Sequence, residues 1–148
     1  MSTKNTILLK GDARQDELRA AGSITPGHLM QRGSANTLVV HATEGGYAER
    51  MFAIEDSMQG KTIADVYTTG LVVTFVQAQK GNLIHAWLKA GENVAIGDRL
   101  ISEGDGTLSK ESNVSSGTTV KDIIGVAEEA VDLSASTAVN TRIEINVT

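Results

Sequence analysis

The 148-residue sequence contains no cysteine and one proline, and its aromatic side chains are one tryptophan, two tyrosines and two phenylalanines. Without cysteine, the chain has no disulfide framework and no thiolate ligand for a metal. With so few aromatic residues, the core has to be built from aliphatic side chains. The single proline beside 15 glycines indicates many tight turns and no rigid linker.

The charge pattern and the apolar pattern each exclude a class of function. The formal net charge is −5 and Lys and Arg are scattered, whereas binding to nucleic-acid phosphates needs clustered basic side chains. No apolar run approaches the roughly 20 residues that cross a bilayer. Residues 1–5 also lack the apolar segment of a secretory signal. The sequence therefore predicts a protein that is made in the cytoplasm and binds neither nucleic acid nor membrane.

Residue types that can support catalysis are present but form no recognisable motif. His28, His41 and His85 lie in separate segments, without a second ligand at metal-site spacing. No serine lies in a G-x-S-x-G sequence, and no glycine-rich stretch has the order of a phosphate-binding loop. We therefore expect no enzyme activity, no cofactor and no metal.

The local pattern predicts an all-β fold, mainly an antiparallel barrel or sandwich with glycine-rich turns and little helix. Thr, Val and Ile are abundant, and these β-branched residues fit a pleated sheet better than a helix. Apolar and polar residues alternate clearly at 142–147, and Asp105-Gly106 is a strong hairpin signal. Residues 121–133 are expected to form one long strand with a bulge at Gly125. The composition of 13–21 predicts two turns of helix.

A weak internal repeat also favours a β architecture. Residues 21–29 can be laid on 90–100 if two one-residue slips are allowed, and the polar turn at 32–36 then corresponds to the turn at 104–106. Two copies of one β-turn-β unit suggest a pseudo-symmetric barrel or sandwich, the alternative being a chance match between glycine-rich loops. The matched positions are Ile24 with Val94, Gly27 with Gly97, Leu29 with Leu100, and Leu38 with Leu108.

The segment 71–76 is the most hydrophobic in the chain and is apolar on both faces. Such a strand is either central, with a two-layer core that buries both faces, or meets a partner subunit. If one face suffices to fill the core, the other is left for self-association, since large exposed apolar patches mark interaction sites. The residues predicted for this contact are Val72, Thr74, Val76, His85 and Trp87.

The first residues are predicted to be an extended arm, residues 1–12, ahead of a single β-rich domain, residues 13–148. The alternative is that the short apolar stretch forms an edge strand laid on the main sheet. The short apolar stretch near the N-terminus has strand propensity, but the sequence that follows it favours helix and supplies no return strand. An unpaired strand exposes N–H and C=O groups that can add to the edge of another sheet. The residues predicted to bind a partner in this way are Thr3, Thr6, Ile7, Leu8, Leu9 and Lys10.

Several phrases, taken in order and spacing, resemble the head decoration (cement) proteins of tailed bacteriophages, and the resemblance covers most of the chain. The phrases lie at 5–12 (NTILLKGD), 24–29 (ITPGHL), 51–56 (MFAIED) with 59–61 (QGK), 91–98 (GENVAIGD), 104–108 (GDGTL) and 124–132 (IGVAEEAVD).

This resemblance implies a virion protein that binds the outer surface of the expanded capsid as a homotrimer at three-fold and quasi-three-fold positions. Its partner would be the major capsid protein, and it would clamp neighbouring copies of that protein against the pressure of internal DNA. The family pattern assigns no functional residues to this sequence. An alternative of a different class is a carbohydrate-binding module, or a tail- or fibre-associated β-module, of a phage.

Overall fold

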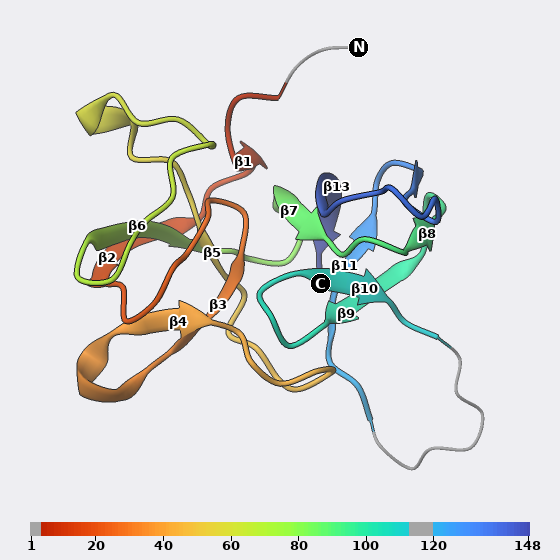
Figure 1. Ribbon diagram of the computed structural model, residues 1–148, viewed down its shortest axis with the longest axis horizontal. Coiled ribbons are helices and arrows are strands. Elements are labelled where there is room, and N and C mark those ends of the chain that lie inside the picture. Colours follow the sequence, from red (N-terminus) through yellow and green to blue (C-terminus); the bar gives the residue numbers. More distant parts are fainter. Residues whose placement is uncertain (1–3, 113–119) are drawn as a thin grey trace.

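In the computed structural model, which describes residues 4–112 and 120–148, the chain forms two small β-barrels side by side (Figure 1). The first barrel is a five-stranded antiparallel sheet in the order β2-β6-β5-β3-β4. A parallel bridge between Ala20 and Leu38 joins its two end strands and closes it. Its strands are β2 (Arg14–Arg19), β3 (Leu29–Arg32), β4 (Leu38–Val40), β5 (Met51–Ala53) and β6 (Val72–Gln77).

The second barrel is formed within a six-stranded sheet. Strand β7 pairs with β13 on one side and, in parallel through Leu88 and Leu108, with β10 on the other, which closes the barrel in the order β7-β10-β9-β11-β13. Its strands are β7 (Leu83–Leu88), β9 (Arg99–Ser102), β10 (Leu108–Lys110), β11 (Ile123–Ala127) and β13 (Thr141–Val147), with β1 (Leu8–Lys10) added to the edge of β7.

The remaining regular structure consists of short connecting elements. Strands β8 (Asn93–Val94) and β12 (Val131–Asp132) pair with each other, and two three-residue 3-10 turns, η1 (Ser34–Asn36) and η2 (Ser57–Gln59), lie in loops. Within residues 4–112 and 120–148 there is no α-helix. The predicted all-β fold class is confirmed, and the barrel alternative is the one realised.

The two barrels repeat one topology strand for strand, including the register. Met30 pairs with Val40 between β3 and β4, and Leu100 pairs with Lys110 between the equivalent β9 and β10. In the same way β2 corresponds to β7, β5 to β11 and β6 to β13. The internal repeat predicted from short loops therefore extends over all the strands of both barrels.

One predicted match within the repeat is wrong. The strand registers make Leu100 the equivalent of Met30, and Arg99 the equivalent of Leu29. No slip is needed at this point of the alignment. Matching residues by apolar character fails at this point, because Leu29 points out of its barrel and its counterpart, Arg99, is charged. The other predicted matches, Ile24 with Val94, Gly27 with Gly97 and Leu38 with Leu108, hold.

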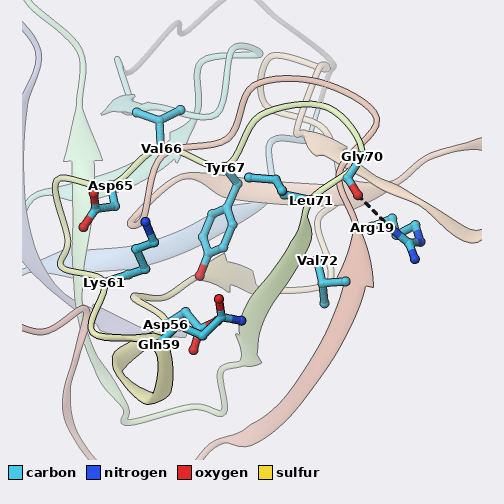
Figure 2. Close-up of a pocket in the computed structure, with 10 residues that line it drawn as sticks. All are labelled: Arg19, Asp56, Gln59, Lys61, Asp65, Val66, Tyr67, Gly70, Leu71 and Val72. Carbon is cyan, nitrogen blue, oxygen red and sulfur yellow. Dashed lines mark hydrogen bonds between the residues drawn. The ribbon is translucent and has the colours of Figure 1, made fainter.

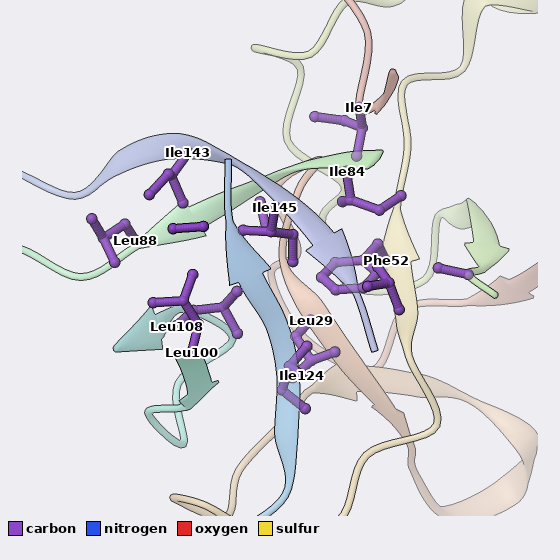
Figure 3. Packing of buried hydrophobic residues seen from close by; sticks show 14 of the residues in the cluster. Ile7, Leu29, Phe52, Ile84, Leu88, Leu100, Leu108, Ile124, Ile143 and Ile145 are labelled. Carbon is purple, nitrogen blue, oxygen red and sulfur yellow. The ribbon is translucent and has the colours of Figure 1, made fainter. Parts of the chain in front are cut away.

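The buried side chains form two clusters, one of which joins the barrels (Figure 3). The first-barrel core lies inside the first barrel and includes Met30, Met51 and Phe75. The shared core fills the second barrel with Ile143, Ile145 and their neighbours, and it also takes in outward-facing side chains of the first barrel. These contributed side chains are Leu29, Phe52 and Val76.

The prediction that β6 leaves one face free for self-association is wrong. Thr74 is 5% exposed and Val76 is 1% exposed within a single chain. Neighbouring side chains of β6 point alternately into the first-barrel core and the shared core, so both faces of this strand are buried. Only Val72, at the start of the strand, is substantially exposed, at 42%.

Two further predictions differ from the structure. Residues 13–21 contain the strand β2 and not a helix, because pairing with β6 overrides the helix-forming composition of an exposed segment. The expected long strand over 121–133 is divided into β11 and β12 by a turn at Glu128-Glu129. The bulge predicted at Gly125 is confirmed by the register shift between β11 and β9.

Because the barrels share a core, we expect them to unfold together. Met30→Ala removes a fully buried side chain from the first barrel and should cost about 2–5 kcal/mol. The only tryptophan, Trp87, belongs to strand β7 of the second barrel. Thermal unfolding of Met30→Ala should show one lowered midpoint by both Trp87 fluorescence and far-UV circular dichroism. Two separate transitions would contradict a shared folding unit.

Candidate interaction surfaces

The N-terminal segment, residues 4–10, lies between the two barrels and contacts both of them (Figure 1). Lys4 Nζ lies 3.1 Å from a carboxylate oxygen of Glu129 and 3.1 Å from one of Glu144, both in the second barrel. Burial acts to lower the pKa of Lys4, but the hydrogen bonds that Lys4 donates to the two carboxylates outweigh this effect, and the pKa is raised. On the other side, the Ile7 backbone N–H donates to Glu55 Oε2, which follows β5 of the first barrel, at 3.1 Å.

Of the two predictions for this segment, a free arm or an edge strand on the main sheet, the edge strand is the one realised. Leu8 pairs with Ile84 and Lys10 with Leu83, and the His85 backbone N–H donates to the Ile7 carbonyl at 2.8 Å. The Ile7 side chain is fully buried in the shared core. The pairing was not evident from sequence because β7, the partner strand, lies far along the chain.

The residues predicted for the arm therefore divide between the interior and the surface. Ile7 is buried, Leu8 and Leu9 are half-buried, and Thr6 and Lys10 are exposed. Thr3 lies outside the described residues. Whether this segment also binds another protein stays a prediction.

The main polar joint between the barrels is a turn of the first barrel, residues 25–28, that is seated on β7. The Pro26 carbonyl accepts hydrogen bonds from Trp87 Nε1 at 2.9 Å and from Arg142 Nε at 3.2 Å. The Arg142 guanidinium also lies over the Trp87 ring, 4.2 Å from its centroid, and donates to the Ile63 carbonyl. His85 and Trp87, predicted for self-association, thus help to join the two barrels within one chain.

Two histidines at this joint are held neutral. Burial, aided by the charge of Arg142 and opposed by that of Asp105, lowers the pKa of His28 to about 4. Burial also lowers the pKa of His85 to about 4, aided by Lys4 and Arg142. The buried Nδ1 of His85 has no hydrogen-bond partner among the described residues, so protonating it would place an unpaired charge at the joint.

A buried serine-histidine pair forms a second joint. His41, after β4, places Nδ1 2.6 Å from Ser102 Oγ of β9, and its Nε2 lies 2.9 Å from the Tyr47 carbonyl. A carbonyl only accepts, so Nε2 carries the proton and Nδ1 accepts from the serine hydroxyl. The pair has the atoms of a nucleophile and a base, but Ser102 is fully buried and no substrate reaches its Oγ.

A bidentate ion pair forms a third joint. Arg50, just before β5, donates from Nη2 to Asp122 Oδ1 at 2.8 Å and from Nη1 to Asp122 Oδ2 at 2.5 Å. Asp122 also accepts from the Ala48 backbone N–H at 3.0 Å. These hydrogen bonds, that of Arg50 foremost, lower the pKa of Asp122. Arg50 also donates from Nη2 to the Ile123 carbonyl at 2.9 Å, so the first barrel is tied to β11.

A cavity of about 340 Å³ lies on the first barrel, away from the joint (Figure 2). Arg19 of β2 closes one side by donating to the Gly70 carbonyl at 2.9 Å. Leu71 and Val72 lie along its rim and are 51% and 42% exposed. Polar side chains of the 56–65 loop line the opposite side, so the cavity combines an apolar rim with mixed charges.

The described residues contain neither a cluster of metal ligands nor a helix that could span a membrane. Among residues 4–112 and 120–148, no three His, Cys, Asp or Glu side chains come together as a group that could hold a metal ion. In the same part of the chain, no helix has the length and apolarity needed to cross a membrane.

Comparison with known proteins identifies the fold. No protein-family model matches the chain, and no curated protein sequence matches it. The structure is similar to the crystal structure of the head fiber gp8.5 N base of bacteriophage phi29, with a TM-score of 0.57 and 14% sequence identity. The match covers 93% of this chain and 95% of the phage chain. The two proteins therefore share a fold over nearly their whole lengths.

We expect the neutral histidines to make stability depend on pH. The unfolded chain takes up protons near the ordinary histidine pKa of 6.5, whereas His28 and His85 in the folded protein do so only near 4. Their contribution is therefore fully present above pH 6.5 and is lost as the pH falls from 6.5 toward 4.

Urea unfolding between pH 7 and pH 4 measures this dependence. In the variant His28→Asn/His85→Gln, the fall in unfolding free energy over this range should be much smaller. The exposed, non-titrating Asn5→Ala serves as the control and should keep the slope. An unchanged slope in the double variant would contradict the assignment.

The burial of Ile7 predicts that the N-terminal segment stabilises the fold. Ile7→Ala should lower the free energy of unfolding by about 2–5 kcal/mol, because it leaves a cavity in the shared core. The nearby exposed Asn5→Ala should change it by less than about 0.5 kcal/mol. Chemical denaturation of both variants measures the difference, and equal stability would mean that the segment is not part of the core.

Proposed function

We propose that the protein is a non-enzymatic structural component of a phage virion, which binds the outside of the expanded head and clamps neighbouring major capsid proteins. The observation that carries the proposal is the fold shared over nearly the full length with a phage head fiber base. The phrases that resemble head decoration proteins support the same assignment independently of the fold. The expected place of the protein is the outer capsid surface, after synthesis in the host cytoplasm.

The physical character of the protein suits such a role. A clamp on a pressurised shell has to resist deformation, and the two barrels are locked by a shared apolar core and three polar joints. It gains strength from many copies, each contributing modest affinity, and a homotrimer multiplies this gain by engaging several sites at once. The net charge of −5 disfavours contact with the packaged nucleic acid.

The N-terminal segment is the surface that we assign to the major capsid protein. Strand β1 is the end strand of its sheet, so its outer edge is available to pair with a strand of the capsid protein. Thr6 and Lys10 are exposed beside this edge, while Ile7 anchors the segment. Because the segment is already ordered, binding does not incur the backbone entropy of about 1–2 kcal/mol per residue that a free arm would lose.

One further candidate function remains. The matched region of the phi29 protein is the base of a head fiber, which favours a fibre-associated module as the second assignment. Carbohydrate binding has less support, because sugar rings stack on exposed aromatic faces. The Trp87 ring is half-buried and covered by Arg142, and Tyr67 is buried. Among the described residues, Tyr47, 79% exposed, is then the single exposed aromatic ring, too little for a stacking platform of several rings.

Co-sedimentation with capsids tests the proposal. The purified protein should pellet with expanded capsids of the major capsid protein and remain in the supernatant with unexpanded ones. Absence of binding to expanded capsids would contradict the capsid-binding function.

The segment itself is tested by placing a charge at its exposed edge. Thr6→Asp should weaken capsid binding about tenfold, equivalent to about 1.4 kcal/mol, and leave the melting temperature unchanged. Thr137→Asp makes the same change at an exposed threonine of the second barrel and should bind normally. If both variants bind alike, the capsid contact lies elsewhere on the molecule.

A further inference from the structure

Backbone contacts also hold the joint between the barrels together. In the 25–28 turn, Pro26 and Gly27 are buried against the second barrel. The Gly27 carbonyl accepts from the Trp87 backbone N–H at 3.3 Å, on the edge of β7 between β1 and β10. The turn is therefore seated on a strand edge and held by main-chain and side-chain donors.

The second barrel carries the same turn, at 95–98, but among the described residues nothing packs against Gly97 as β7 packs against Gly27. Both turns are built alike: Thr25 N–H donates to His28 Nδ1 at 3.1 Å, and Ala95 N–H donates to Asp98 Oδ2 at 2.8 Å. Their exposure differs sharply, because Ile96, at the position of buried Pro26, is 69% exposed. An isoleucine at the tip of an exposed turn has no role in the core.

We call the edge of β7 that receives the 25–28 turn the seat. The first barrel carries an equivalent of this seat on strand β2. Arg19 pairs with Val72 between β2 and β6, at the positions where Trp87 pairs with Arg142 between β7 and β13. The Ala20 N–H donates to the Leu71 carbonyl. Alternation along an antiparallel pair then directs the Arg19 N–H away from β6. Among the described residues, no strand pairs with this outer edge of β2 as far as Arg19, and β4 joins the edge only beyond it, at Ala20.

The equivalence extends to the contact at the end of each seat. The Ala21 N–H donates to the Leu38 carbonyl at 2.9 Å, and the Lys89 N–H donates to the Leu108 carbonyl at 2.9 Å. Beside the first-barrel seat lies the 340 Å³ cavity, whose apolar rim includes the exposed Leu71. The seat thus offers a free backbone donor next to apolar surface.

A reciprocal contact repeats the pattern in the opposite direction. The Gly106 N–H of the second barrel donates to the His41 carbonyl at 3.2 Å, and its Cα packs against Val40. The equivalent turn of the first barrel, η1, is exposed, and so is Lys110, which stands at the position of Val40. Each half of the joint therefore has an unoccupied counterpart on the opposite end of the chain.

The side chains at the counterpart positions are complementary in charge. Leu29 and Ile84 both belong to the shared core that joins the barrels. Their equivalents are Arg99 and Asp16, both exposed and of opposite sign. Each also has a partner of opposite charge in its own chain, Glu111 at 2.9 Å from Arg99 and Arg14 at 3.5 Å from Asp16. A charged pair suits a contact between separate chains better than an apolar pair does, because charged surfaces stay hydrated before the chains associate.

We propose that the 95–98 turn of one copy docks on the β2 edge of a second copy, with Ile96 against Leu71 and Val72. The Gly97 carbonyl then accepts from the Arg19 N–H, as the Gly27 carbonyl accepts from Trp87 within the chain. The contact is heterologous, since its two surfaces lie on different barrels, so repeated copies close into a ring or extend. This contact rests on the proposed function, because it supplies the surface for the self-association proposed there. It can be tested without capsids.

Engineered cysteines test the contact directly, because the natural chain has none. Ile96→Cys and Val72→Cys are prepared separately and mixed under mild oxidation. A disulfide-linked pair should form in the mixture and in neither variant alone. A cross-link that forms equally within a single variant would overturn the arrangement, because like residues do not face each other in a heterologous contact.

Association measured by light scattering provides the second test. Ile96→Asp and Val72→Asp should each dissociate the wild-type assembly to monomers, and mixing them should restore a one-to-one dimer through the single intact interface. Val139→Asp, at an exposed valine outside both surfaces, should associate like wild type. Leu71→Asp replaces Val72→Asp if the latter does not fold.

A wild-type protein that is monomeric at its highest soluble concentration would overturn the proposal, and so would the absence of a dimer in the mixture. Either result leaves capsid co-sedimentation as a separate measurement, so failure of this contact and failure of capsid binding are distinguishable.

Discussion

The structure depends on the outer face of the first barrel being buried by the second. Leu29, Phe52 and Val76 point away from their own barrel and enter the shared core. A barrel of five short strands encloses few side chains, and small cores stabilise a fold only marginally. Sharing one apolar cluster overcomes this limit, and it also explains why β5 and β6 are buried on both faces.

Because the barrel topology occurs twice, the chain has two sets of equivalent surfaces, and these differ in their side chains. Every strand register of one barrel recurs in the other, so the backbone constraints are the same in both. The outward-facing side chains are not conserved between the halves: Leu29 corresponds to Arg99, and Pro26 to Ile96. One copy of each surface is buried in the joint, and the other remains available for contact with other molecules.

This arrangement connects the fold with the proposed role. A head-bound structural protein needs a rigid body, a surface for the capsid and a surface for its own copies. The N-terminal segment contributes to the first by placing Ile7 in the core and to the second by leaving the edge of β1 free. The unoccupied turn and seat on the two barrels supply the third.

The sequence by itself determined the β fold class, the Asp105-Gly106 hairpin, the Gly125 bulge and part of the repeat, because these depend on local alternation and turn chemistry. Tertiary structure decided the rest. Residues 13–21 became a strand through pairing with β6, and Ile7 found its partner on β7, contacts between segments too distant for local patterns to indicate. The burial of Val76 likewise depended on which surface the second barrel covers, and that is set by how the two barrels pack.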